Sequence, residues 1–482
     1  MQVLRERRAG GLQGCPSPAL ISCGCLLLAG CAQFVPMPIE PGDNLRGLEG
    51  RTLSDPRLGQ YAGTVLKGEC PAWPPGAWDL RTLTLAALYF HPDMEAARAR
   101  LALAEAGKIT AGQRPNPTLS VGPSLNETMI LPSPWLVTAS LDVPIETAGK
   151  RGHRLAQARH LSEAAAHGVA TAAWGVRSRL RAALLEAWAA EESGRLLEQQ
   201  LAAQGEVVRL VEGRLAAGGA APADVSRERV TLERARMDAL DARNRRAQAT
   251  VRLAGALGVS PKALEGVALS FDAFTGTPRE VPVAEARRRA LLSRADIRAS
   301  LSEYAATESA LRLEIAKQYP DVRLGPGYEF DQGDHKWGLG LNIELPLLNR
   351  NRGPIAEAEA RRRGAAAAFN GLQASVLGEI EGALAEQEAA RQKVAAAEEL
   401  VSQLARQERL ARGSFKAGEV SREAVAAATV ERTSAALAQF EARVRWAESQ
   451  GRLESALQSP LDMPPPTRSP SSRGNQPKVP SP

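Results

Sequence analysis

The sequence predicts a mainly α-helical fold that carries membrane-crossing β-hairpins and is built as a two-fold internal repeat. The 482-residue chain is rich in Ala, Arg, Glu and Leu and contains only 4% aromatic residues, a composition typical of long helices. Two stretches alternate between apolar and polar residues, as strands do when one face meets lipid and the other water. Each stretch lies in a different half of the chain, and the halves match when displaced by about 200 residues.

The N-terminus has the features of a secretory signal. Arginines precede a short apolar run that ends Leu28-Ala29-Gly30-Cys31. This ending is similar to a bacterial lipobox, in which Cys31 is lipidated, with palmitate among its acyl chains, and becomes the first mature residue. We therefore expect a signal peptide at 1–30 and a lipidated, extended segment at 31–79. An ordinary signal peptide with a coincidental cysteine is the alternative.

Composition excludes several classes of protein. The net charge of +6 is small for this length, and basic residues are interleaved with acidic ones, so we expect no nucleic-acid partner. Removal of the signal would leave Cys70 without an intramolecular partner, so no disulfide framework is available. No later stretch has the roughly twenty apolar residues of a spanning helix. Strands must therefore make any membrane crossing.

The clearest strand signal is a hairpin at about 320–346. Apolar residues alternate with polar ones from Val322 to Phe330, and the alternation resumes from Trp337 to Leu345. Each arm has about ten residues, the length that a tilted strand needs to cross a bilayer. The first half contains a corresponding hairpin at about 116–144.

Helices flank both hairpins at corresponding positions. In the first repeat, 80–258, we expect helices at 80–114, 146–214 and 222–258. In the second repeat, 283–458, we expect helices at 283–318, 353–414 and 420–458. The longest would extend about 90 Å at 1.5 Å per residue. Residues 259–282 form a linker, and the Pro- and Ser-rich segment 459–482 is expected to be disordered.

Four strands cannot close a barrel in lipid, where open sheet edges are not tolerated. Several chains must therefore share one barrel. Two chains would supply about eight strands around a filled interior, whereas three would supply about twelve around a channel. The inward residues are Gly, Ser, Thr, Asn and charged residues rather than bulky apolar ones, which favours the channel. We expect a homotrimer with a 12-stranded barrel and a long antiparallel α-helical tunnel in the periplasm.

The ordered combination of features resembles the TolC-like outer-membrane efflux proteins. It includes the lipobox, the helix–hairpin–helix repeat, and two junctions, Pro144-Ile-Glu-Thr-Ala-Gly-Lys-Arg151 and Leu345-Pro-Leu-Leu-Asn-Arg-Asn-Arg-Gly353. The resemblance implies a trimeric channel in the outer membrane of a Gram-negative bacterium, with a small mixed equatorial region. It also implies the exit duct of a tripartite pump, with a periplasmic adaptor and an RND-type inner-membrane transporter as partners. The junctions look most like the heavy-metal-efflux branch, while drug efflux and type I secretion remain alternatives.

The resemblance assigns an adaptor contact to the turns between the long helices. Arg214-Leu-Ala-Ala-Gly218 and Ser414-Phe-Lys-Ala-Gly418 occupy these turns. The contact candidates are Arg214, Leu215, Gly218, Phe415, Lys416 and Gly418.

The family also places acidic residues after these turns, where they ring the closed pore. Asp224 matches this acidic position in the first repeat. The second repeat departs from the pattern, because Ala424 occupies a position where acids can stand, and Glu419 and Glu423 are the gate candidates there. Simple capping of a helix N-terminus by these acids is the alternative.

Three histidines, His153, His160 and His167, recur every seven residues and invite a metal-relay interpretation. Residues seven apart lie about 10.5 Å apart along a helix, too far to share one ion at bond lengths near 2 Å. Solvated or packed histidines are the alternative. No catalytic triad, phosphate loop or metal-ligand spacing is present, so we expect no enzyme, cofactor or resident metal.

A non-conducting coiled-coil protein of the cell envelope is the alternative from a different functional class. Such a spacer would need long helices but not two hairpins with glycine-rich polar faces. The hairpins therefore favour the duct.

Overall fold

The computed structural model describes residues 34–66, 73–125, 133–276, 283–331 and 333–461. The chain divides into two compact units, Met1–Gly50 and Arg51–Pro482, which we describe separately. In the described part of the first unit, α2 (Pro41–Glu49) is a short helix with exposed Leu45 and Leu48. The second unit contains the remaining elements.

The segment expected to be extended up to residue 79 is partly helical, which corrects that prediction. It contains α2 in the first unit and α3 (Pro56–Val65) in the second. Both helices begin with proline, whose missing N–H is not needed at the first helical position. Asp55 also caps α3 by accepting a hydrogen bond from the N–H of Arg57 at 2.8 Å.

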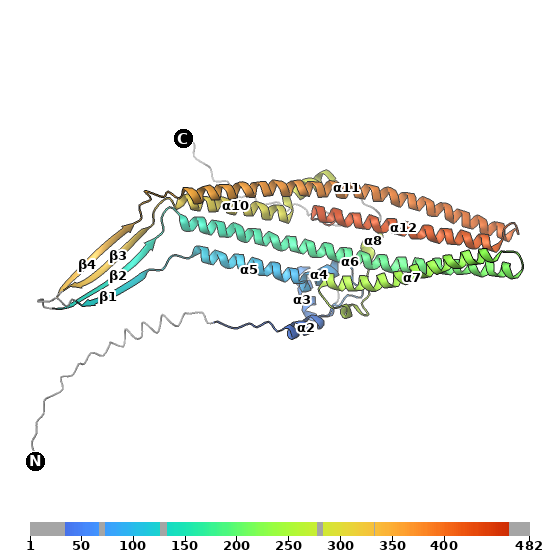
Figure 1. Cartoon of the computed structure of the whole chain (residues 1–482), viewed down its shortest axis with the longest axis horizontal. Helices are drawn as coiled ribbons and strands as arrows, with labels where there is room; N and C mark the ends of the chain where they lie inside the picture. Colours follow the sequence, from blue (N-terminus) through green and yellow to red (C-terminus); the bar gives the residue numbers. More distant parts are fainter. Residues whose placement is uncertain (1–33, 67–72, 126–132, 277–282, 332, 462–482) are drawn as a thin grey trace, which may run out of the picture. The chain divides into compact units, whose positions relative to one another are not determined.

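Two similar sets of helices make up most of the second unit (Figure 1). The first set is α4 (Leu80–Phe90), α5 (Pro92–Gly112), α6 (Lys150–Ala216) and α7 (Pro222–Leu257). The second set is α9 (Val283–Ser293), α10 (Ala295–Ala316), α11 (Arg352–Lys416) and α12 (Arg422–Leu457). The 67-residue α6 is roughly 100 Å long and packs against α5, α7, α10 and α12. In turn, α11 packs against α10 and α12.

Each repeat begins with two helices, which corrects the single helices expected at 80–114 and 283–318. In the first repeat, Pro92 lacks the N–H that would continue a helix, so the chain breaks at His91. His91 is extended, and its Nδ1 accepts the N–H of Asp93 at 3.1 Å. The second repeat breaks at Arg294 without a proline.

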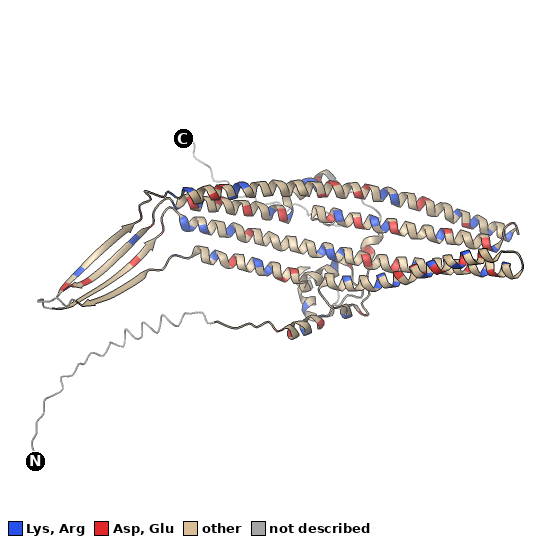
Figure 2. Cartoon of the chain, viewed as in Figure 1, with Lys and Arg blue, Asp and Glu red and all other residues tan. Residues whose placement is uncertain are grey.

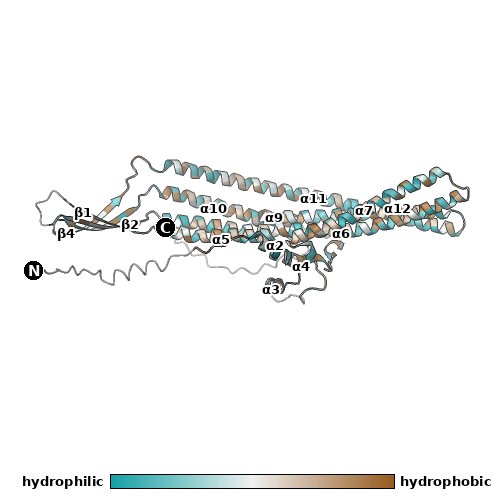
Figure 3. Ribbon diagram, turned by 60° about the horizontal axis from the view of Figure 1, so that its bottom comes forward, coloured by the Kyte–Doolittle hydropathy of each residue, from teal (hydrophilic) through white to brown (hydrophobic). Residues whose placement is uncertain are grey.

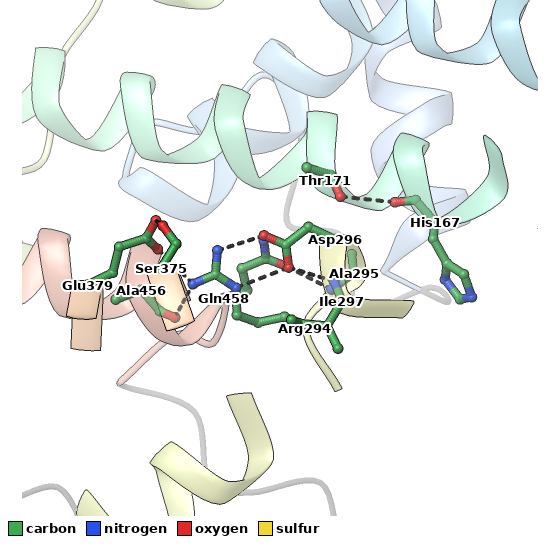
Figure 4. Close-up of polar contacts among 10 residues, drawn as sticks. All are labelled: His167, Thr171, Arg294, Ala295, Asp296, Ile297, Ser375, Glu379, Ala456 and Gln458. Carbon is green, nitrogen blue, oxygen red and sulfur yellow. Dashed lines mark hydrogen bonds and ion pairs between the residues drawn. The ribbon is translucent and has the colours of Figure 1, made fainter. Parts of the chain in front are cut away.

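A polar cluster around the buried side chain of Arg294 holds the break (Figure 4). The Arg294 guanidinium donates to the carbonyl oxygen of Ala456 at 2.7 Å and forms ion pairs with Asp296 at 2.7 Å and Glu379 at 2.9 Å. The side chain of Gln458 accepts the N–H of Ala295 at 2.9 Å. These contacts join the start of α10 to α11 and to the end of α12.

The expected linker 259–282 contains the 3-10 helix η1 (Pro261–Leu264) and the short helix α8 (Asp272–Thr275). Trp78 and Leu269 form an isolated parallel bridge beside these helices. The largest hydrophobic core joins this region to α3, α4, α6 and α7; its most buried leucines are Leu58, Leu83, Leu180, Leu184, Leu253 and Leu257. A smaller core joins α9, α10, α11 and α12 through Ala290, Ile297, Val376, Ile380 and Leu453.

The hairpins form one four-stranded antiparallel sheet in the order β1 (Thr118–Leu125), β2 (Trp135–Ile145), β3 (Val322–Asp331) and β4 (Asp334–Ile343). The two hairpins meet along β2 and β3, where Ala139 lies opposite Tyr328. The strands β1 and β4 are therefore the edges of the sheet.

Charged residues of both signs are interleaved along the long helices (Figure 2). Ion pairs recur at equivalent positions, because Arg243–Glu198 and Arg443–Glu398 both measure 3.3 Å and differ by 200 residues in number. Polar and apolar residues also alternate along these helices (Figure 3). Within the described ranges, none of the helices is apolar over a stretch long enough to cross a membrane.

Candidate functional site

One face of the sheet is apolar and exposed. On β3 and β4, Tyr328 lies opposite Trp337 and Pro326 lies opposite Leu339, all within one apolar row. Trp337 is 82% exposed and Leu339 is 74% exposed. A contiguous apolar surface of this kind indicates contact with lipid or with another protein.

The opposite face of the sheet carries few side chains at its centre. Two glycine pairs face each other across β3 and β4, Gly325 with Gly340 and Gly327 with Gly338. A Cβ added at any of the four would come no closer than 3.4 Å to its neighbours, and none of them has a positive φ. Neither crowding nor backbone conformation therefore requires glycine here. Because the four glycines have no side chains, this face has an open surface with a hollow of about 460 Å³.

A buried lysine joins the sheet to the helices. Lys150, at the start of α6, donates from Nζ to the carbonyl oxygen of Tyr319 and to the carboxylate of Asp321, both at 2.7 Å. The N–H of Thr147 also donates to Asp321 at 2.9 Å. Because α6 belongs to the first repeat and Asp321 precedes β3 of the second, these bonds hold the two hairpins side by side.

The corresponding junction of the second repeat uses an asparagine. Asn351 adopts a left-handed conformation with φ 58°, which asparagine tolerates better than most residues. Its side-chain amide donates to the carbonyl oxygen of Glu314 at 2.7 Å and to the Glu314 carboxylate at 3.0 Å. This junction therefore contacts α10 of its own repeat.

The tips of the two helical hairpins have the same turn. Gly218 and Gly418 are left-handed, with φ values of 76° and 79°, and the N–H after each glycine donates back to the carbonyl oxygen of Arg214 or Ser414 at 2.8 or 2.9 Å. A left-handed glycine closed by this bond is a common way to end a helix. Both predicted tip glycines thus stand where the chain reverses.

The other predicted adaptor-contact residues differ in exposure. Leu215 is half-buried and packs into a small apolar core around Val207, Val211 and Val225. Phe415 is 44% exposed, and Lys416 is also exposed. Phe415 and Lys416 therefore remain available to a partner, whereas Leu215 mainly stabilises the tip.

Two ion pairs connect the first tip to α12. Arg214 pairs with Glu423 and also donates to the carbonyl oxygen of Gly219 at 2.8 Å. Arg422 pairs with Glu206 at 3.3 Å. Two predicted site residues, Arg214 and Glu423, thus meet across the two repeats.

The three candidate gate acids have different surroundings. The carboxylate of Asp224 accepts the N–H of Ala221 at 3.2 Å, so it caps the first turn of α7. In the second repeat the hydroxyl of Ser421 accepts the N–H of Ala424 at 3.3 Å, so α12 is capped without an acid at position 424. Glu419 is exposed, and its side chain has no hydrogen bond or ion pair within the described part of the chain. The gate role of Asp224, Glu419 and Glu423 stays a prediction.

A buried carboxylate near the second tip was missed in the sequence. Glu408 on α11 accepts hydrogen bonds from Arg412 at 2.7 Å and Thr429 at 2.9 Å and pairs with Arg432 at 2.6 Å. Burial opposes its ionisation, but the bonds from Arg412 and Thr429 and the charges of both arginines outweigh burial and lower the pKa of Glu408. The four-residue spacing of Glu408 and Arg412 is visible in the sequence and indicates an ion pair along one helix face. It does not indicate that Glu408 is buried.

The three histidines do not come together. The Nδ1 atom of His160 lies 3.1 Å from the carboxylate of Glu163. The carbonyl oxygen of His167 accepts a hydrogen bond from the hydroxyl of Thr171 at 3.2 Å (Figure 4). In the ranges that the structure describes, no three His, Cys, Asp or Glu side chains are grouped closely enough to hold a metal ion. The predicted lipidation site Cys31, the signal peptide and most of the expected tail lie outside the described residues.

The chain is similar to known efflux proteins over both repeats. The family model described as outer membrane efflux protein matches residues 85–259 and 286–458. The cobalt-zinc-cadmium resistance protein CzcC of Cupriavidus metallidurans is 28% identical over 275 residues, which span 55% of this chain and 62% of that relative.

Solved structures show the same fold. The outer membrane protein VceC of Vibrio cholerae has a TM-score of 0.66 at 22% identity, over 79% of this chain and 96% of that one. CusC, whose structures concern transmembrane channel formation, has a TM-score of 0.64 at 18% identity, over 80% of this chain and 94% of that one. Because the family model covers both repeats, the chain belongs to the outer membrane efflux protein family.

Proposed function

We propose that this protein is the outer-membrane exit duct of a tripartite efflux pump and works as a homotrimer. The observation that carries the proposal is the four-stranded sheet, whose edges β1 and β4 are open and whose inner face is lined by glycine. Open edges are not tolerated in lipid, so neighbouring copies must pair them. Three copies give about twelve strands, enough for a water-filled lumen.

The long helical pairs would continue this lumen into the periplasm. Both tips reverse at a left-handed glycine, Gly218 or Gly418, and the second tip also carries the exposed Phe415 and Lys416. We propose that these tips contact a periplasmic adaptor protein, which connects the duct to an RND-type inner-membrane transporter. Lipidation at Cys31 would anchor each copy to the outer membrane. The duct itself is passive, because its energy comes from the transporter.

We further propose heavy-metal cations as the cargo. CzcC, the relative at 28% identity, is named for resistance to cobalt, zinc and cadmium. Drug efflux and type I secretion are the alternatives within the duct class. A deletion strain that becomes sensitive to zinc, cobalt or cadmium, and not to drugs, supports the metal assignment.

The acids near the tips are proposed to charge the periplasmic entrance. The variant Asp224→Asn keeps an oxygen that can accept the N–H of Ala221, so it separates charge from capping. Combined with Glu419→Gln and Glu423→Gln, it removes three negative charges per copy. We expect lower cation selectivity and a changed resting conductance in planar bilayers. Unchanged selectivity and conductance would assign these acids to helix capping and packing alone.

The duct itself is tested by conductance of the purified full-length protein in planar bilayers. A non-conducting envelope spacer would insert no pores. The glycine pairs on the inner face favour the duct, because glycine weakens a strand by roughly 0.5–1 kcal/mol relative to alanine and gives a spacer nothing in return. Pores of uniform conductance are the expected result.

A further inference from the structure

We propose that the segment after β4, residues 345–352, binds the head groups of anionic phospholipids at the periplasmic surface of the outer membrane. The proposal rests on the proposed function, because it requires the hairpin sheet to span the membrane. The segment reads Leu-Pro-Leu-Leu-Asn-Arg-Asn-Arg, three leucines followed by two arginines. Apolar groups that reach lipid beside basic groups that reach phosphate are favoured at a membrane–water interface.

The leucines continue the apolar row of β4 beyond the end of the strand. This row has a spacing of two and comprises Trp337, Leu339, Leu341, Ile343, Leu345 and Leu347. Leu347 is 75% exposed, and the neighbouring Leu348 is fully exposed. The strand β4 ends at Ile343, and the chain then bends, because the N–H of Leu347 donates to the carbonyl oxygen of Leu345 at 2.8 Å. From Trp337 to Ile343 the strand rises roughly 20 Å at about 3.3 Å per residue, so a tilted β4 carries most of the apolar band of about 25 Å. Trp337 therefore lies near one interface, and the exposed leucines that follow Ile343 lie near the other.

The two arginines that follow the leucines are free. Arg350 and Arg352 are exposed, and within the described ranges neither side chain has a hydrogen bond or ion pair. They lie three and five residues beyond Leu347, where the apolar row ends. Two basic groups are thus held at the depth of the lipid phosphates.

The basic turn of the first repeat has no such free charge. Lys150 is buried against Asp321. Arg151 donates to the last carbonyl oxygen of α5 at 2.6 Å, and Arg154 forms an ion pair with Glu146. The basic residues of the first turn thus make polar contacts within the protein, whereas Arg350 and Arg352 of the second turn make none with the residues that the structure describes. The shared fold does not require this difference.

A second copy of the chain is the competing occupant, because β4 is an edge strand. In the proposed barrel, β4 pairs with β1 of the next copy, and residues 113–117 lead into β1. Their sequence is Gln-Arg-Pro-Asn-Pro, in which Arg114 is the charged residue and is exposed. A positive charge there disfavours contact with Arg350 and Arg352. Charge complementarity therefore favours a phosphate over a second copy.

The test measures lipid preference of the full-length trimer by native mass spectrometry, with tail-matched phosphatidylglycerol and phosphatidylcholine. The test variant is Arg350→Gln/Arg352→Gln. The control Arg234→Gln/Arg445→Gln removes the same charge from two exposed arginines on α7 and α12 that also lack partners in the described part of the chain. A basic residue at an anionic surface is worth about a factor of five, so we expect roughly 30-fold weaker phosphatidylglycerol binding in the test variant only.

Each outcome is decisive when the same samples are also recorded in planar bilayers. The proposal is supported if the preference for phosphatidylglycerol over phosphatidylcholine is lost in the test variant but kept in the control and in Arg350→Lys/Arg352→Lys. Conducting wild-type trimers without a preference overturn the lipid site and leave the duct intact. A test variant that dissociates into monomers assigns the segment to a second copy and overturns the lipid site. Wild-type protein that inserts no pores overturns both proposals.

Discussion

Replacing Glu408 with glutamine is expected to loosen the α11–α12 pair near the second tip. Glu408 is 7% exposed, and its carboxylate is held by Arg412, Thr429 and Arg432. Glutamine keeps the size of the side chain but removes its charge, and its amide group cannot accept all three bonds. A hydrogen bond to a charged group contributes about 1.5–3 kcal/mol. Both arginines still reach water, so we expect a net loss of about 2–3 kcal/mol in local stability.

Hydrogen exchange of the backbone amides in residues 403–412 and 425–433 measures this loss. A fall of about 2–3 kcal/mol in opening free energy makes exchange roughly 30- to 150-fold faster. Glu388→Gln is the matched control on α11, because Glu388 is exposed and pairs with Arg391 three residues away. The control should change little. Equal exchange rates in the two variants would refute the idea that Glu408 fastens the tip.

Three further predictions concern the same framework. Because folding lowers the pKa of Glu408, its contribution to stability is present above the usual value of 4.5 and is lost as the pH falls through the lower folded value. The tip should therefore become acid-labile in the wild type but not in Glu408→Gln. Equal acid sensitivity of the two proteins would contradict this. Gly258→Ala should destabilise the protein by about 2–4 kcal/mol in chemical unfolding, because a Cβ there would lie 2.9 Å from the backbone of His91. Gly266 is also left-handed but has no neighbour within 4 Å of an added Cβ, so Gly266→Ala should cost only about 1 kcal/mol. Arg294→Gln should cost about 3–5 kcal/mol in chemical unfolding, because it leaves the buried carbonyl oxygen of Ala456 and the partly buried carboxylate of Asp296 without their partner. A loss below about 1 kcal/mol, as for a surface substitution, would contradict the central role of its cluster.

The hairpins and the tip turns could be predicted because their signals are local. A strand shows its faces in every second residue, so the row from Trp337 onward reveals the apolar face without knowledge of the fold. The turns at Gly218 and Gly418 are also local, because glycine is favoured in the left-handed conformation that ends a helix. Pro92 is a local signal for the break at His91 that the expected helix at 80–114 did not take into account.

The contacts between repeats could not be predicted from local signals. Arg214 meets Glu423 across 209 positions of the sequence, and Lys150 meets Asp321 across 171. Each pairing depends on how α6 packs against α10 and α12. The break at Arg294 has the same cause, because its main acceptor, the carbonyl oxygen of Ala456, lies 162 residues away.

Cysteine accessibility in single channels tests the central claim most directly. In a Cys70→Ser background, Gly338→Cys places a thiol on the glycine-lined face, where a Cβ has free space, and Leu339→Cys places one on the apolar face. A charged, water-soluble thiol reagent should reduce the conductance of Gly338→Cys pores in three steps, one for each copy, and leave Leu339→Cys pores unchanged. Equal reduction in the two variants, or no effect on either, would contradict a shared barrel whose lumen is lined by the glycine pairs.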